Sequence, residues 1–186
     1  MSQSSLISLS QLRMGYTRFS QLTEPRVLPD YDLRLFRPGD EDAWIAILNT
    51  GDFGVWDYSR LRRMLAGERA PLPLEGIYFI TKNNQPVGTT CVFLHTSARG
   101  ATPELGWVAV LPSQRGLGLG LSLCQAALCF VRDRGYSYMF LKTEDFRLAA
   151  IKTYLRLGFE PELTDPSHML RWQALRDLLF GSSIKS

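Results

Sequence analysis

The chain has 186 residues and a formal net charge of +3, with 45% hydrophobic and 21% charged residues. These values are typical of a single soluble globular domain that buries a real core. They exclude a strongly basic nucleic-acid-binding protein, since the chain has no block of lysines or arginines. No apolar run approaches the length of a membrane span. We therefore expect neither a nucleic-acid nor a membrane partner.

Cysteine and histidine usage predicts a reducing compartment. The three cysteines, Cys91, Cys124 and Cys129, are odd in number, lack C-x-x-C spacing and lie in apolar segments, so we expect buried reduced thiols. The two histidines are far apart in the sequence, so no metal site is expected. The N-terminus has neither the basic start nor the apolar core of a secretory signal. Together these features predict a cytoplasmic protein.

Residues 1–30 are expected to form an N-terminal arm, with four serines in the first eight positions. The spacing of the apolar residues favours a short amphipathic helix near residues 7–14, followed by an irregular segment. One interpretation is an arm that docks on a partner subunit, which leaves a homodimer open. The favoured interpretation is a poorly ordered tail, or a segment that docks on its own domain.

The folded part is expected to begin with a strand over residues 31–36, where apolar and polar residues alternate. Asp40 is a candidate N-cap for a helix from Glu41 to Leu48, which has acidic residues in its first turn. A second helix is expected over residues 58–66. Its apolar positions would face the core, and its arginines would face outward.

The loop between these two helices carries an acid and two aromatic residues, Asp52, Phe53 and Trp56. Such a group would frame a cationic amine substrate. It would equally serve as a lid over the core, and the residue types alone favour the lid.

Strands are expected over residues 76–81 and 86–94, joined by a tight hairpin connection. A loop over residues 96–102 leads to a nearly unbroken apolar run from Leu105 to Leu111, which is typical of a strand buried on both faces. Glu104 opens this strand, either as a partly buried carboxylate or as an exposed strand-end acid.

A turn with three alternate glycines follows this strand and precedes a long apolar helix that runs to about Arg134. Arg115, Gly116, Gly118 and Gly120 lie where the first N–H groups of that helix have no partners, so the turn favours an anion. Glycine allows a phosphate to approach the backbone, and the arginine adds a positive charge. Either this turn binds a pyrophosphate or it is a flexible connection that binds nothing.

The remaining elements alternate between strand and helix. We expect a strand over residues 136–141, a helix over 147–157 and a strand over 159–163. Pro166 follows the candidate N-cap Asp165, so a final helix is expected from Pro166 to Phe180.

Two motifs in this order resemble the GNAT superfamily of acetyl-CoA-dependent N-acetyltransferases. The first is Arg115-x-x-Gly118-x-Gly120 after the apolar strand, and the second is the segment A-I-K-T-Y-L-R-L-G-F over residues 150–159. The resemblance implies an α/β acyl-CoA N-acyltransferase fold, with a mixed, mostly antiparallel central sheet and helices on both faces. It implies a GNAT domain over residues 31–165. The final helix expected from the sequence itself would form a C-terminal helical extension over residues 166–186 packed on this domain, where a typical family member closes with a seventh strand.

The resemblance also implies roles for individual residues. Tyr154 matches the acid that protonates the leaving thiolate, and Glu104 stands where many members place the base. The loop with Asp52, Phe53 and Trp56 would line the acceptor site. The acetyl-CoA site would be built from Val108, Val110, Arg115, Gly116, Leu117, Gly118, Leu119 and Gly120. One position departs from the family, because Arg147 stands where an asparagine near the pantetheine arm is common.

The sequence therefore predicts an N-acetyltransferase that transfers an acetyl group from acetyl-CoA to a primary amine, of a small molecule, by direct attack on the thioester. A non-catalytic acyl-CoA-binding sensor is one alternative. A protein or peptide N-acetyltransferase is another. Nothing in the sequence identifies the acceptor amine.

Overall fold

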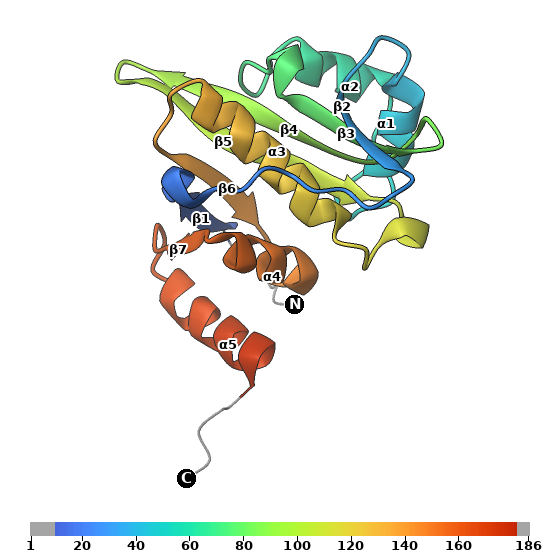
Figure 1. The fold of residues 1–186 in the computed structure, drawn as a ribbon. Coiled ribbons are helices and arrows are strands. Elements are labelled where there is room, and N and C mark those ends of the chain that lie inside the picture. Colours follow the sequence, from blue (N-terminus) through green and yellow to red (C-terminus); the bar gives the residue numbers. More distant parts are fainter. Residues whose placement is uncertain (1–9, 182–186) are drawn as a thin grey trace, which may run out of the picture.

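A seven-stranded sheet, described in a computed structural model for residues 10–181, forms the centre of the protein (Figure 1). Its strands run in the order β2-β3-β4-β5-β6-β1-β7, and all neighbouring pairs are antiparallel except β5 and β6. In chain order the strands are β1 Leu12–Tyr16, β2 Tyr31–Leu35, β3 Ile77–Lys82, β4 Gln85–Ser97, β5 Gly100–Val110, β6 Met139–Thr143 and β7 Glu160–Glu162. The expected mixed, mostly antiparallel sheet is confirmed.

Helices cover both faces of this sheet. They are α1 Glu41–Leu48, α2 Tyr58–Leu65, α3 Leu119–Asp133, α4 Leu148–Leu157 and α5 His168–Phe180. Helices α1 and α2 share one hydrophobic cluster with Phe79 and Phe93 of the sheet, whereas α3 and α4 share another with Val92 and Leu105. Adjacent residues of a strand point to opposite faces, so Val92 and Phe93 assign the two clusters to opposite sides. Helix α5 packs beside α4, at the edge of the molecule (Figure 1).

The N-terminal segment contributes a strand to this sheet, between β6 and the edge strand β7, which the sequence did not predict. Residues 12–16 form β1, which pairs antiparallel with β6 on one side and β7 on the other. The helix expected near residues 7–14 is therefore wrong for residues 12–14, and residues 7–9 lie outside the described part. Leu12 and Met14 are fully buried in the cluster that contains α3 and α4.

Polar side chains of α3 are covered by the segment that follows β1. Figure 1 shows this segment crossing α3. Ser122 donates a hydrogen bond to the carbonyl of Arg26, and Arg132 forms an ion pair with Glu24 at 2.9 Å. The N-terminal segment thus covers the polar side of α3. The sequence of a helix alone does not reveal which segment packs over it.

Two local predictions need correction. The loop expected over residues 96–102 is a tight hairpin, because β4 extends to Ser97 and β5 begins at Gly100. Asp40 precedes α1, but its carboxylate accepts hydrogen bonds from Arg34 rather than from the helix. The Arg34 guanidinium holds the pKa of Asp40 below its usual value.

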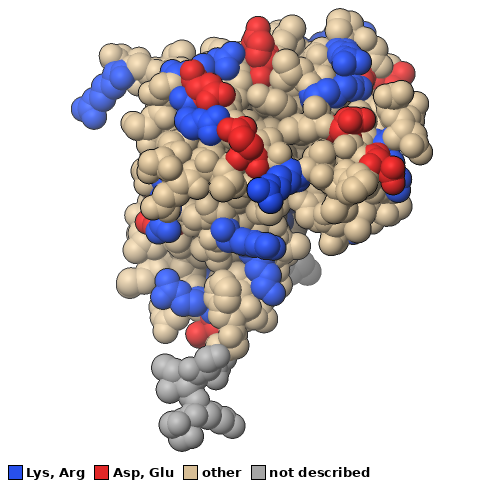
Figure 2. Space-filling view, in the orientation of Figure 1, with Lys and Arg blue, Asp and Glu red and all other residues tan. Residues whose placement is uncertain are grey.

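All three cysteines are buried free thiols, as expected. Burial raises the pKa of Cys124 to about 12 and that of Cys129 to about 11, so both remain protonated at neutral pH. Within residues 10–181, no helix combines the length and apolar character needed to cross a bilayer. Figure 2 shows basic and acidic side chains interspersed over one face of the molecule.

Candidate active site

A cleft opens where β5 and β6 separate. The two strands pair only at Glu104 with Phe140 and at Leu105 with Leu141, after which β5 continues without β6 beside it. At the same level β5 bulges against β4, because Cys91 pairs with Gly106 while Thr89 pairs with Ala109. Trp107 lies in this bulge with a φ of +50°, an uncommon backbone conformation for a non-glycine residue.

The cleft has a volume of about 270 Å³. Its lining comes from six parts of the chain: Gln11 before β1, the loop after α1, Arg69 in the loop after α2, strand β5, the end of β6, and the segment of α4 with the residue before it. These residues include Asp52, Phe53, Arg69, Glu104, Trp107, Val108, Lys142, Glu144, Arg147 and Tyr154. The structure therefore brings both predicted catalytic residues to one cavity.

Glu104 is a buried carboxylate, with a relative exposure of 2%. One of its oxygens accepts a hydrogen bond from Arg69, and the other is paired with Nε2 of His95. A carboxylate has about four lone-pair sites, so these two contacts leave others for a further donor. Of the two alternatives that the sequence left open, the structure supports the buried carboxylate.

Tyr154 lies on α4 and lines the opposite side of the cleft from β5. Its side chain is almost entirely buried, and its ring contacts Phe159 edge-on with centroids 5.9 Å apart. No described residue makes a hydrogen bond to its hydroxyl. Burial raises the pKa of Tyr154 well above its usual value, so the phenol keeps its proton at neutral pH.

The glycine turn has the open geometry that a phosphate needs. Gly116 and Gly118 have φ values of +80° and +77°, and α3 begins at Leu119 directly after Gly118. No heavy atom lies within 4 Å of the position that a Cβ would take at Gly116, Gly118 or Gly120. The free N–H groups of the first turn of α3 are thus accessible to an anion.

A second groove of about 310 Å³ begins at Arg115, directly before the glycine turn, and adjoins the cleft. Its lining includes Val108 and Val110 of β5 and the start of α4, and it shares Asp52, Phe53 and Arg147 with the cleft. The groove and the cleft together therefore extend from Arg115 to Tyr154. These residues fit an extended ligand with a phosphate group at one end.

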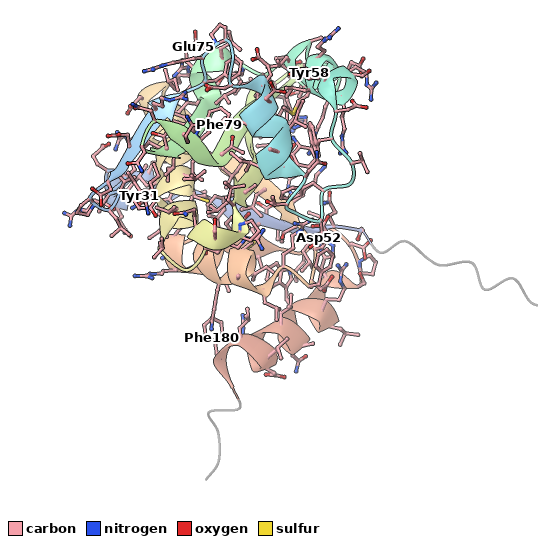
Figure 3. All side chains as sticks on the ribbon, turned by 90° about the vertical axis from the view of Figure 1, so that its right-hand side faces the viewer. Tyr31, Asp52, Tyr58, Glu75, Phe79 and Phe180 are labelled. Carbon is pink, nitrogen blue, oxygen red and sulfur yellow. The ribbon has the colours of Figure 1, made fainter. Side chains whose placement is uncertain are left out.

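Three arginines hold the loop after α1 over this groove. Arg115 donates to the carbonyl of Thr50 at 3.0 Å, Arg147 to that of Asp52 at 2.6 Å, and Arg60 to that of Phe53 at 3.0 Å. Figure 3 shows Asp52 on the loop that connects α1 with α2, where this loop comes close to α4. Arg115 also donates to Val110, so its guanidinium is engaged with backbone carbonyls rather than free.

The predicted loop residues do not all reach the cleft. Asp52 and Phe53 line it, and Phe53 contacts Trp107 edge-on at 5.4 Å. Trp56 is absent from the lining and is 3% exposed, packed behind Trp107 with ring centroids 4.9 Å apart. Its place matches the lid-over-the-core interpretation better than a substrate contact.

Sequence reasoning missed several polar residues of the site. Arg69 and His95 belong to no motif; the loop after α2 brings Arg69 to Glu104, and the pairing of β4 with β5 brings His95 there. Lys142 and Glu144 lie at the end of β6, next to the separation of the strands. In the sequence, Lys142 and Glu144 lie between an apolar strand and the second motif, and this position was the one feature that could have identified them.

The comparisons with known proteins agree with this geometry. The model of the Acetyltransferase (GNAT) family matches residues 40–159, which is more than half of the chain. The chain belongs to this family. Its members use acetyl-CoA, and the resemblance found in the sequence is confirmed.

Relatives and solved structures extend the match. A mycothiol acetyltransferase from Thermobispora bispora is 32% identical over 158 residues, covering 79% of this chain and 52% of that protein. The chain thus spans about half the length of the curated relatives it matches. A GCN5-related N-acetyltransferase from Sphaerobacter thermophilus has a TM-score of 0.66 at 23% identity, covering 83% of this chain and 50% of that one. Naa50 from Arabidopsis thaliana, solved with a bisubstrate analogue of coenzyme A, has a TM-score of 0.58 at 22% identity over 73% of this chain and 85% of its own.

Proposed function

We propose that this chain is an acetyl-CoA-dependent N-acetyltransferase that acts on a primary amine of a small molecule. The observation that carries the proposal is a groove that runs from Arg115, directly before the open glycine turn, to a cleft lined by both Glu104 and Tyr154. Membership of the GNAT family supports acetyl transfer as the chemistry. The name of the curated relatives, mycothiol acetyltransferase, supports a small-molecule acceptor.

In this proposal the acetyl-CoA site runs along the groove and the cleft. The glycine turn and the first turn of α3 hold the pyrophosphate, with Leu117 and Leu119 placing their N–H groups there. Val108 and Val110 of β5 line the pantetheine portion. Arg115 reaches the phosphates after releasing a backbone carbonyl, since a charge-assisted bond to phosphate is stronger than one to a neutral carbonyl. The bound group supplies an activated acetyl thioester.

Residues of the chain then transfer the protons and stabilise the negative charge that develops on the carbonyl oxygen. Glu104 accepts the proton of the ammonium, directly or through water, because an ammonium has no free lone pair for attack. Trp107 and Val108 have no partner residue on β4, and a backbone N–H of this bulge stabilises the oxyanion. Tyr154 donates its proton to the departing thiolate, and its burial ensures that this proton is present.

The test is a panel of primary amines with acetyl-CoA, assayed for release of the free coenzyme A thiol. A small-molecule acceptor should give release that depends on both the amine and the intact chain. A peptide with a free α-amine in the same panel distinguishes a protein acetyltransferase. Tight acetyl-CoA binding by calorimetry without release for any amine would identify the chain as a sensor and overturn the proposal.

A further inference from the structure

Among residues 10–181, Lys142 is the one lysine that lines the cleft. The chain holds 17 arginines but 4 lysines, at positions 82, 142, 152 and 185. Lys82 lies at the turn between β3 and β4, and Lys152 lies on the outer surface of α4, in a different hollow. Every other cation of the cleft is an arginine, which stays protonated under all ordinary conditions. Lysine differs because it can lose its proton and become a nucleophile.

Lys142 lies on the same side of the sheet as Glu104. Glu104 pairs with Phe140 across β5 and β6, and Lys142 follows Phe140 by two residues on the same strand. Residues two apart share a face, so Lys142 and Glu104 point to one side. The ammonium lies 6.0 Å from the centre of the Phe140 ring. Tyr154 reaches the cleft from α4.

The other charged groups nearby are already engaged. Arg69 contacts Glu104, Arg13 contacts Glu162, and Arg147 contacts Glu144. Lys142 is exposed to the cleft, and its ammonium has no hydrogen bond or ion pair with any residue from 10 to 181. An unengaged amine therefore lines the same cleft as Glu104, on the same side of the sheet.

We propose that the protein acetylates its own Lys142. The inference rests on the proposed acetyl transfer from acetyl-CoA. In the reaction the Lys142 ammonium gives one proton to Glu104, and its Nζ then attacks the thioester carbonyl. The new C–N bond forms, the C–S bond breaks, and the thiolate takes a proton from Tyr154. The nitrogen loses its second proton as the amide forms, and this proton restores Tyr154. The products are Nζ-acetyl-Lys142 and the coenzyme A thiol, and one proton passes to solvent.

The consequence is a chemical change at the acceptor side of the cleft. Acetylation removes the positive charge of Lys142 and adds an apolar acetyl group to the lining of the cleft. The modification occurs within one chain, because Lys142 and the path for acetyl-CoA belong to the same cleft.

The experiment uses the full chain with acetyl-CoA labelled with ¹³C in the acetyl group and no added amine. Peptide mapping by mass spectrometry follows the label at Lys142, with Lys82 and Lys152 as internal controls for uncatalysed acetylation. Lys142 should gain up to one acetyl group per chain, on the order of 100-fold faster than either control, as expected for acid–base assistance. The rate per chain should not change when the protein is diluted.

Two variants separate catalysed from spontaneous modification. Tyr154→Phe should slow labelling of Lys142 by on the order of 100-fold and leave the controls unchanged. Lys142→Arg should abolish the fast label. Labelling of Lys142 no faster than of Lys82, or equal labelling in Tyr154→Phe, would overturn the inference. If external amines are acetylated while Lys142 stays unmodified, the self-acetylation of Lys142 is refuted and the proposed function stands. If neither Lys142 nor any external amine is acetylated, the proposed function is refuted as well.

Discussion

Replacing Tyr154 with phenylalanine should separate catalysis from folding. The ring of Tyr154 is buried against Phe159, but its hydroxyl has no hydrogen-bond partner among residues 10–181. Removing this oxygen leaves no buried group unpaired, so the free energy of unfolding should change by less than about 1 kcal/mol. By comparison, truncation of a buried aromatic residue to alanine costs about 3–5 kcal/mol.

Turnover should fall far more than stability. A positioned proton donor contributes about 100- to 10,000-fold, which corresponds to roughly 2.7–5.4 kcal/mol in the barrier. The assay compares kcat of the wild type and Tyr154→Phe with acetyl-CoA and the best amine of the panel, and urea unfolding supplies the stability. The loss should shrink with an acetyl thioester of a more acidic thiol, because a better leaving group needs less protonation.

Two results would refute this reasoning. An equal loss with natural and activated thioesters would show that Tyr154 positions the coenzyme and does not protonate it. An unchanged kcat would show that Tyr154 has only a structural role in the core.

Three further perturbations test the cofactor site, the base and the sheet. Gly118→Asp and Gly120→Asp should abolish acetyl-CoA binding in calorimetry while the fold survives. The control Gly100→Asp, at an equally open glycine in the β4–β5 hairpin, should bind acetyl-CoA normally. Normal binding by both turn variants would show that the acetyl-CoA site lies elsewhere. Glu104→Gln should lower kcat by about 100-fold or more and remove the acidic limb of the pH–rate profile, and a wild-type rate would exclude Glu104 as the base. Met14→Ala should lower the free energy of unfolding by about 2–5 kcal/mol in urea titrations, because Met14 of β1 is fully buried. A change below about 1 kcal/mol would contradict the contribution of β1 to the hydrophobic core.

The predictable features were those that depend on residues close together in the sequence. The glycine turn and α3 follow from a strand, three alternate glycines and an apolar helix in direct succession, and the structure has them in that order. The second motif likewise forms α4, and Gly158 ends it in a left-handed conformation. Local signals of this kind need no knowledge of the remaining chain.

The missed features depend on pairing between distant segments. Residues 12–16 carry no strong strand pattern, and they form β1 because β6 and β7 leave room for an antiparallel strand between them. The partners of Glu104 come from a loop 35 residues earlier and from the neighbouring strand. Sequence reasoning placed Glu104 correctly at the start of the core strand but had no means of finding Arg69 or His95.

The most direct test of the central claim follows a ¹³C-labelled acetyl group from acetyl-CoA to its destination. The acetylated amine and the free coenzyme A thiol are quantified in the same reaction, by mass spectrometry and a thiol assay. Our account predicts that the label appears on the nitrogen of a small primary amine, with one thiol released for each amide formed. Thiol release without an acetylated product, or acetyl-CoA binding without release for any amine, would contradict it.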